Sequence, residues 1–337
     1  EAANYPFCAI EPNTGIVAVP DIRLKKLSEL ANSQKVIPAQ MQFVDIAGLV
    51  SGASKGEGLG NKFLSHIREV DAIVHVLRCF EDTEITHVEN TINPLRDCEI
   101  IETELMLADL DSLDKQIQNL SKKAKSNDPD TKKDLALMKD LHILLSEGKP
   151  VRSADFDNEK MKKVKTFNLL TSKPVLYVCN VSEKDAALGN EFSQVISEKA
   201  KQENCVSVII SGAIEAEIAL LNEEEKNEFL MDLKLEESGL NRLIRKGFDL
   251  LDLLTFFTIG PKEARAWTLK KDSTAPEAAG SIHTDFQKGF IRAETISYDD
   301  YLTYRSEQAV KDSGRMRVEG SDYIVQDGDI FHFRFNV

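Results

Sequence analysis

The stretch FVDIAGLVSGASKGEGLGNKF, residues 43–63, decides the class of fold. Its apolar start, ending at Val44, is typical of a β-strand, and Asp45-Ile46-Ala47-Gly48 matches the D-x-x-G turn of P-loop NTPases. In those enzymes the Asp reaches Mg²⁺ through a water, and the Gly allows the backbone to come close to the γ-phosphate. We therefore expect Asp45 to act at a Mg²⁺ ion and Gly48 to contact the γ-phosphate.

The residue after this turn departs from the usual pattern. Ras-like enzymes have a Gln there, which orients the attacking water, whereas this chain has Leu49, which cannot form a hydrogen bond. Another group must then position the water. His87 is the candidate, because it follows the strand-like run VHVLRCF in a polar loop, and catalytic groups often lie in such loops. An ordinary surface histidine is the alternative.

Composition narrows the classes of protein that the chain can belong to. Its 337 residues suffice for two or three domains, and 42% hydrophobic and 29% charged residues are ordinary for a globular protein. No apolar run approaches the roughly 20 residues of a membrane helix, and five unclustered cysteines favour reduced thiols in the cytoplasm over disulfides or zinc. The net charge of −14 repels nucleic acid, so an RNA contact needs a local basic patch.

Alternating strand and helix patterns predict an α/β domain. The strand-like runs are AIVHVLRCF, PVLYVCNV and CVSVIISGA, and EFSQVISEKAKQE between the last two has helical spacing. Such alternation indicates a parallel sheet. We assign residues 1–98 and 168–254 to this nucleotide-binding domain.

A helical pattern interrupts the α/β domain over residues 99–167. Apolar residues recur there at steps of three and four on both sides of a turn-forming SNDPD, namely at Met106, Leu110, Leu113, Ile117, Leu120 and Ala124, and then at Leu135, Met138, His142 and Leu145. This predicts an inserted αα-hairpin that forms an antiparallel coiled coil. Two ordinary core-facing helices are the alternative.

Residues 255–337 read as a separate small domain. Strand-like pieces dominate it, and we expect only one or two helices. Asp327-Gly328 predicts a hairpin turn.

Two further strand-end loops follow in the order expected of a nucleotide-binding sheet. Asn180-Val181-Ser182-Glu183 stands where a Ras-like protein has N-K-x-D, and Ser211-Gly212-Ala213 resembles the base loop that follows it. Ligands of open α/β sheets bind at the carboxyl ends of the strands, so we expect these residues to surround the base. Glu183 is longer than the Asp that grips the N–H pair of guanine, which favours ATP over GTP. A surface Glu is the alternative.

The phosphate-binding loop itself is missing from the pattern. The glycines at positions 52, 56, 58 and 60 do not fit G-x-G-x-x-G, and no G-x-x-x-x-G-K-[ST] occurs. The sequence begins with Glu1 and not with Met, and we expect it to start downstream of the natural N-terminus.

Longer motifs give a specific resemblance. NYPFCAIEPNTG, FVDIAGLVSGASKGEGLGNKFLSHIRE, RCFEDTEITHV, NVSEKD, EARAWTLKKDSTAPEAAGSIHTDFQKGFIRAE and DYIVQDGDIFHFRFNV resemble the YchF, or Obg-like ATPase, family. The resemblance covers the whole chain. It implies a Ras-like P-loop NTPase domain, an inserted α-helical domain and a C-terminal TGS domain of β-grasp fold. It also implies ATP and Mg²⁺ as ligands, ribosomes or translation factors as partners, and a phosphate-binding loop upstream of NYPF.

One residue departs from the family pattern. Family members usually have Thr in PFCTIEP, whose hydroxyl suits Mg²⁺, and this chain has Ala9. Either fewer protein oxygens hold the ion, which Mg²⁺ tolerates because it retains waters, or the position was altered.

Together these features predict a cytoplasmic regulatory ATPase whose hydrolysis is slow and stimulated by a partner. An RNA contact through the TGS domain would use Lys270, Lys271, Lys288 and Arg292. The alternative is a non-catalytic scaffold whose helical and TGS domains bind RNA or protein.

Overall fold

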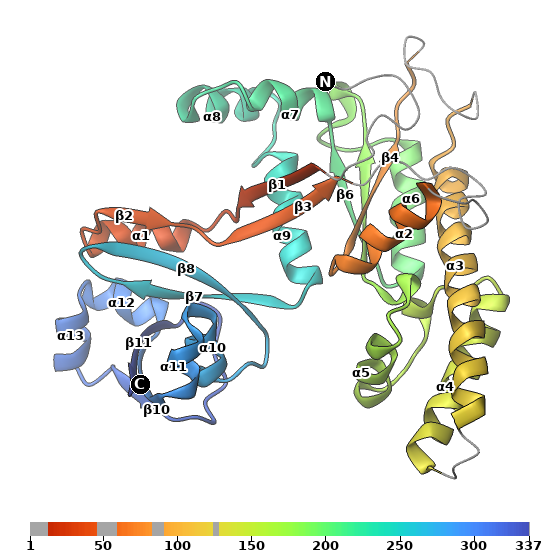
Figure 1. The fold of residues 1–337 in the computed structure, drawn as a ribbon. Helices are drawn as coiled ribbons and strands as arrows, with labels where there is room; N and C mark the ends of the chain where they lie inside the picture. The colour runs from red at the N-terminus through yellow and green to blue at the C-terminus, as the bar shows by residue number, and fades with distance from the viewer. Residues whose placement is uncertain (1–12, 46–58, 83–90, 124–127, 337) are drawn as a thin grey trace. The chain divides into compact units, whose positions relative to one another are not determined.

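The computed structural model describes residues 13–45, 59–82, 91–123 and 128–336 (Figure 1). The chain divides into two compact units: unit 1 comprises residues 1–14 and 44–243, and unit 2 comprises residues 15–43 and 244–337. Residues 15–43 thus group with the C-terminal residues. The sequence instead predicts three domains, formed by residues 1–98 with 168–254, by 99–167 and by 255–337. That three-domain division stays a prediction.

Unit 1 is built on a parallel sheet with the strand order β4-β5-β6. The strands are β4 (Ile73–Arg78), β5 (Val175–Asn180) and β6 (Val206–Ile210). The first five residues of β5, VLYVC, are all buried, as an apolar run predicts for a strand covered on both faces. The predicted parallel strands are confirmed, although β6 ends before the expected Ala213 because a helix starts at Gly212.

Helices surround this sheet and extend away from it. The α-helices of unit 1 are α2 (Leu59–Glu69), α3 (Pro94–Lys123), α4 (Pro129–Ser146), α5 (Asn158–Thr166), α6 (Glu191–Gln202), α7 (Gly212–Ile218), α8 (Glu223–Asp232) and the first part of α9 (Gly239–Leu250). The short 3₁₀ turns are η2 (Val151–Ser153), η3 (Leu170–Ser172) and η4 (Glu183–Asp185).

The long helices α3 and α4 form the predicted hairpin (Figure 1). Leu113, Met138, Leu141 and Leu145 are buried in their shared core, with the predicted seam residues of α3 packed around them. His142 of α4 is not a member of this apolar core. Its Nε2 lies 3.1 Å from the carboxylate of Asp114 on α3, so it makes a polar contact between the two helices. Ala124 lies outside the described residues.

A buried ionic network joins the hairpin to the sheet. Arg152 of η2 pairs with Glu102 of α3, and Lys199 of α6 lies 3.0 Å from the same carboxylate. The Tyr177 hydroxyl on β5 lies 2.8 Å from a carboxylate oxygen of Glu102 and 2.8 Å from one of Glu203. These contacts connect four elements that are far apart in the sequence.

Unit 2 contains a mixed sheet with the strand order β10-β9-β11-β7-β8-β2. Its strands are β2 (Lys35–Ile37), β7 (Leu253–Ile259), β8 (Glu263–Lys270), β9 (Phe290–Ile296), β10 (Arg317–Glu319) and β11 (Ile330–Phe335). Its helices are α1 (Ile22–Leu30), α10 (Ala275–Ile282), α11 (Thr284–Lys288), α12 (Tyr298–Tyr304) and α13 (Glu307–Asp312). The strands β1 (Asn13–Ala18) and β3 (Gln40–Asp45) form a two-stranded sheet, so β3 is a strand as predicted but pairs outside the parallel sheet.

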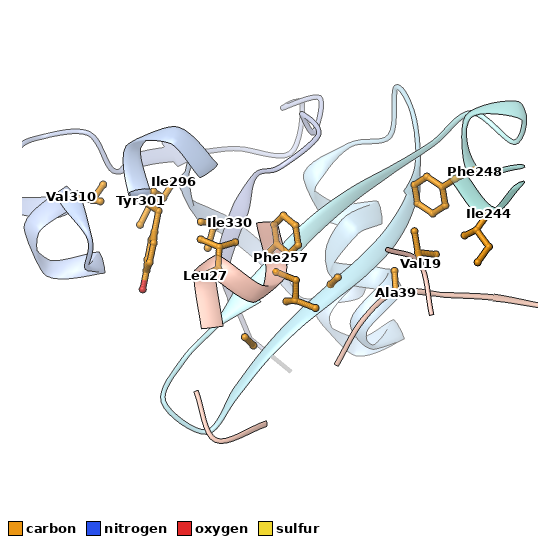
Figure 2. Packing of buried hydrophobic residues seen from close by; sticks show 13 residues of the cluster. Val19, Leu27, Ala39, Ile244, Phe248, Phe257, Ile296, Tyr301, Val310 and Ile330 are labelled. Atoms are coloured by element: carbon orange, nitrogen blue, oxygen red, sulfur yellow. The ribbon is translucent and has the colours of Figure 1, made fainter. Parts of the chain in front are cut away.

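Each face of the larger sheet carries a hydrophobic core. Phe257 lies beside Leu27 of α1 in the core on one face, which also includes Ile244 and Phe248 of α9 (Figure 2). The next residue, Phe256, packs on the other face with Phe331. The alternation of side chains along a strand places these neighbours on opposite faces. Residues 15–43 are therefore part of the core on the Phe257 face.

Two expectations for the C-terminal residues are corrected. Between Leu253 and Asn336, all of which the structure describes, there are four short helices, and not one or two. Asp327-Gly328 forms a turn, with the Asp329 N–H donating to the Gln326 carbonyl, but not a hairpin. The strands before and after it, β10 and β11, lie on either side of β9 and do not pair with each other. The α/β fold class with a helical insert and a β-rich C-terminal region is confirmed.

Candidate nucleotide-binding site

The carboxyl ends of β5 and β6 bring the two predicted base loops together. Asn180 is the last residue of β5, and Gly212 follows β6 by two residues. The Gly212 N–H donates to the Asn180 Oδ1 at 2.9 Å. Adjacent parallel strands end at the same edge of a sheet, which is where ligands of open α/β sheets bind.

The first loop is attached firmly to the sheet. Val181 is 2% exposed and belongs to the core of unit 1, and its N–H donates to the Ile210 carbonyl at 2.8 Å. Its side chain thus points into the protein. Glu183 begins η4 and is exposed.

A hydrogen-bond network that the sequence reasoning missed shapes the rest of this loop. The Ser182 hydroxyl donates to Asp185 Oδ2 at 2.8 Å, and Asn190 Nδ2 donates to the same oxygen at 3.0 Å. Asn190 Nδ2 also donates to the Cys79 carbonyl at 2.8 Å, which ties the loop to the end of β4. The hydrogen bonds from Asn190 and Ser182 lower the pKa of the Asp185 carboxyl. Asn190 caps α6 together with Ser193, and its position directly before the helical run EFSQVISEKAKQE is the signal by which it could have been found.

The second loop contains a buried polar atom. Ser211 is 3% exposed, and its Oγ has no hydrogen-bond partner in the part of the chain that the structure describes. Buried hydroxyls are nearly always satisfied, so an unsatisfied one beside a predicted base loop fits a site that a polar ligand completes. Ala213, two residues on, is exposed.

Asp45 is an exposed residue at the carboxyl end of β3. A carboxylate is the oxygen ligand that Mg²⁺ prefers, so Asp45 fits the predicted role. Across the described ranges, no group of three or more His, Cys, Asp or Glu is placed to hold a metal ion. Ala9, Gly48, Leu49 and His87 lie outside the described residues.

A polar cavity of about 460 Å³ lies in unit 2 and not at these loops. Four of its charged groups form ion pairs: Arg23 pairs with Asp327 at 2.6 Å, and Arg317 pairs with Asp329 at 3.2 Å. The cavity is therefore better explained by ion pairs that hold the turn before β11 than by a ligand.

Within the described ranges, no helix combines the length and the apolar composition that crossing a bilayer requires.

Comparison with known proteins identifies relatives over the whole chain. A model described as "50S ribosome-binding GTPase" matches residues 1–124, and one for the C-terminal part of YchF GTPases, described as a protein of unknown function, matches residues 253–336. The "Ribosome-binding ATPase YchF" of Pasteurella multocida is 55% identical over 337 residues, which are 100% of this chain and 93% of that protein. The proteins of the same name from Escherichia coli O157:H7 and Bacillus subtilis are each 52% identical, again over 100% of this chain and 93% of theirs.

Solved structures agree with this relationship. The structure of the Schizosaccharomyces pombe YchF GTPase matches with a TM-score of 0.86 and 37% identity, over 98% of this chain and 90% of that one. A GTP-binding protein from Pyrococcus horikoshii matches with a TM-score of 0.59 and 18% identity, over 96% and 92% of the two chains, and supports the fold alone. The chain belongs to the YchF family.

Proposed function

We propose that the protein is a cytoplasmic regulatory ATPase that binds ATP with Mg²⁺, hydrolyses it slowly and associates with the ribosome. One observation carries this proposal. The hydrogen bond from the Gly212 N–H to the Asn180 Oδ1, 2.9 Å long, joins the two base loops at the carboxyl edge of the parallel sheet. Relatives named ribosome-binding ATPases match the chain from end to end. The alternative of a non-catalytic scaffold is not favoured, because that match includes every nucleotide motif of the chain.

ATP in preference to GTP is supported by Glu183. This residue is exposed directly after the loop that would face the base, so its carboxylate is free to approach a nucleotide. Its extra methylene disfavours the bidentate grip that guanine needs, whereas adenine lacks that donor pair. The names of relatives differ on this point, with ATPase for the bacterial proteins and GTPase for the solved Schizosaccharomyces pombe structure.

Mg²⁺ would be held by the nucleotide phosphates, by waters and by Asp45, either directly or through one of those waters. When bound, the ion neutralises negative charge that develops on the phosphates. Asp45 would orient the ion from the end of β3, and Gly48 would contact the γ-phosphate.

Slow hydrolysis is supported by Leu49, which cannot orient a water. His87 is the side chain that we propose for this task, since a neutral imidazole can accept a hydrogen bond from water. In the full-length protein, His87→Ala should lower single-turnover ATP hydrolysis by about 10²-fold with ATP affinity unchanged. A rate within a few-fold of the parent would exclude His87 from catalysis.

The test of the function is turnover by the full-length protein with Mg²⁺, measured with ATP and with GTP and repeated after adding ribosomes. Slow ATP hydrolysis that exceeds GTP hydrolysis, together with co-sedimentation with ribosomes, supports the proposal. No turnover of either nucleotide would favour the scaffold.

An RNA contact through the C-terminal residues, with the expected TGS fold, belongs to this proposal. Lys270, Lys271, Lys288 and Arg292 are exposed, which supports such a contact, although Arg292 lies 3.9 Å from Glu294 and is partly neutralised. Co-sedimentation of K270E/K271E/K288E with ribosomes at increasing salt tests it, because lost phosphate contacts reduce the salt dependence.

A further inference from the structure

Three exposed apolar side chains lie on the segments that form one small core in unit 1. Leu188, Leu220 and Met231 are 93%, 87% and 75% exposed, the highest values for large apolar residues in the described part of the chain. The segments that carry them pack together through Ala186, Ile214, Ile218 and Leu230. Each exposed residue lies within two positions of one of these buried residues. We call residues 186–188 and 212–232 the α7–α8 lobe.

The same lobe is strongly acidic. Of the ten residues of α8, EEEKNEFLMD, five are acidic and one is a lysine, so a helix of ten residues carries −4 of the net charge of −14. Glu224, Glu228 and Met231 follow at steps of four and three and therefore share one face of α8. Leu230, 5% exposed, anchors the opposite face.

Only some of these carboxylates form hydrogen bonds that stabilise the helices. Glu225 completes the capping box of α8 with Asn222, and Glu215 of α7 accepts hydrogen bonds from the Gly239 and Leu240 N–H groups at the start of α9. Glu224 and Glu228 are exposed and have no ion pair or side-chain hydrogen bond within the described residues. One face of α8 thus combines the exposed apolar side chain of Met231 with these two exposed carboxylates.

We propose that the α7–α8 lobe binds a protein segment rich in lysine and arginine that also carries apolar side chains. The acidic face repels the phosphates of RNA and attracts a basic segment. Met231 gives an adaptable apolar contact, and a cationic amphipathic segment would match both features.

The position of the lobe connects this contact to the nucleotide. Ala186 follows Glu183 by three residues, and α7 starts directly after Ser211. A bound segment would therefore contact elements that continue from both base loops. The inference rests on the proposed ribosome association, and it assigns a basic protein segment, and not ribosomal RNA, to this side of unit 1.

The experiment compares two double variants with a matched control. L220S/M231S removes apolar surface, and E224K/E228K reverses the charge on the outer face of α8. E29K/E198K makes the same change of net charge at exposed positions on α1 and α6. All six side chains are exposed, so unchanged circular dichroism and melting temperature should confirm that each variant folds.

The probes are purified ribosomes and a fluorescent amphipathic peptide made of leucine and lysine. We expect L220S/M231S and E224K/E228K each to weaken peptide binding and ribosome co-sedimentation by at least about 10-fold, and E29K/E198K to change them by less than about 2-fold.

Three outcomes overturn the inference. Unchanged binding by both lobe variants means that the face is only solvated, and stronger co-sedimentation of E224K/E228K means that it faces RNA. Equal losses in E224K/E228K and E29K/E198K mean that diffuse charge, and not the lobe, governs binding. If the parent does not sediment with ribosomes, the proposed association itself fails, and the peptide titration alone then decides whether the lobe is a docking surface.

Discussion

Glu183 is the residue at which we expect nucleotide choice to be decided. It is exposed at the start of η4, after a loop that is tied to β6 by Val181 and to β4 by Asn190. Since this loop is held independently of Glu183, changing that side chain should alter recognition without disturbing the fold.

Replacing Glu183 with Asp should shift binding preference toward GTP, because the shorter carboxylate can meet the N–H pair of guanine. The shift should remain partial, because Val181, whose position carries Lys in the N-K-x-D motif, is buried in the core. Competition binding with the two nucleotides measures the effect, and Glu183→Gln is the control that keeps the length and removes the charge. An unchanged ATP preference in Glu183→Asp would show that another residue selects the base.

We expect His75 on β4 to make stability depend on pH. Its Nδ1 lies 4.0 Å from the sulfur of Cys98, and its ring faces Tyr177 at 6.0 Å. Burial lowers the pKa of His75 to about 4, with charges on Glu102, Asp97, Arg152 and Lys199 acting in both directions. The ordinary value is about 6.5, so the fold favours the neutral ring.

Above pH 6.5 His75 is neutral in both the folded and the unfolded chain, and the free energy of unfolding is then at its full value. As the pH falls from 6.5 toward 4, the unfolded chain binds a proton at His75 that the folded chain does not, so the free energy of unfolding decreases. Between pH 7 and 5 this should lower the free energy of unfolding by about 2 kcal/mol. Urea denaturation at both pH values tests it, with His75→Gln as the comparison. If the two proteins lose equal stability, His75 is not the responsible group.

At the scale of elements, the network around Arg152 is a buried polar connection between the hairpin and the sheet. Although burial opposes ionisation, Arg152 and Lys199 lower the pKa of Glu102, so its carboxylate stays charged. Arg152 and Glu102 side chains are only 7% and 9% exposed. Removing one partner of such a pair leaves a buried charge without compensation.

Arg152→Met should therefore lower the free energy of unfolding by about 3 kcal/mol or more. The control is Lys115→Ala, which breaks the Lys115–Asp111 pair of α3, whose side chains are 71% and 69% exposed. An exposed pair of this kind contributes less than about 1 kcal/mol. Urea denaturation of both variants measures these changes. Equally small losses in the free energy of unfolding would show that Lys199 alone neutralises Glu102.

At the scale of the whole molecule, residues 15–43 belong to the same unit as residues 244–337, so deleting the C-terminal residues also affects residues 15–43. Leu24 and Leu27 of α1 are 4% and 0% exposed and belong to the same core as Phe257 and Ala264. A chain cut before Thr255, as the three-domain division suggests, loses these partners. The deletion should therefore uncover an apolar surface on residues 15–43.

We expect the shortened chain, residues 1–254, to bind a hydrophobic dye and to associate into larger species in size-exclusion chromatography. L24S/L27S in the same shortened chain is the matched variant, and it should reduce both effects, because it removes the uncovered side chains. A shortened chain that stays monomeric without dye binding would support the three-domain boundaries instead.

The sequence alone was sufficient for the features that depend on near neighbours along the chain. The apolar run in PVLYVCNV predicted a strand of the parallel sheet, and the seam of α3 predicted a helix of the hairpin, because an apolar run and a spacing of three and four residues are both local features. The order of the two base loops was also predictable, since parallel strands in one sheet end at the same edge.

Only the tertiary structure decided which segments meet. The sequence pattern of residues 15–43 does not show which segment they pack against. Their burial against Phe257 depends on contacts between residues more than 200 positions apart, and the Arg23–Asp327 pair likewise joins residues separated by 304 positions. Asp327-Gly328 specifies a turn but not a hairpin, since β9 inserts between the flanking strands. The charges of Glu102 and Arg152 likewise look like surface charges in the sequence, and only their burial together makes them a structural connection.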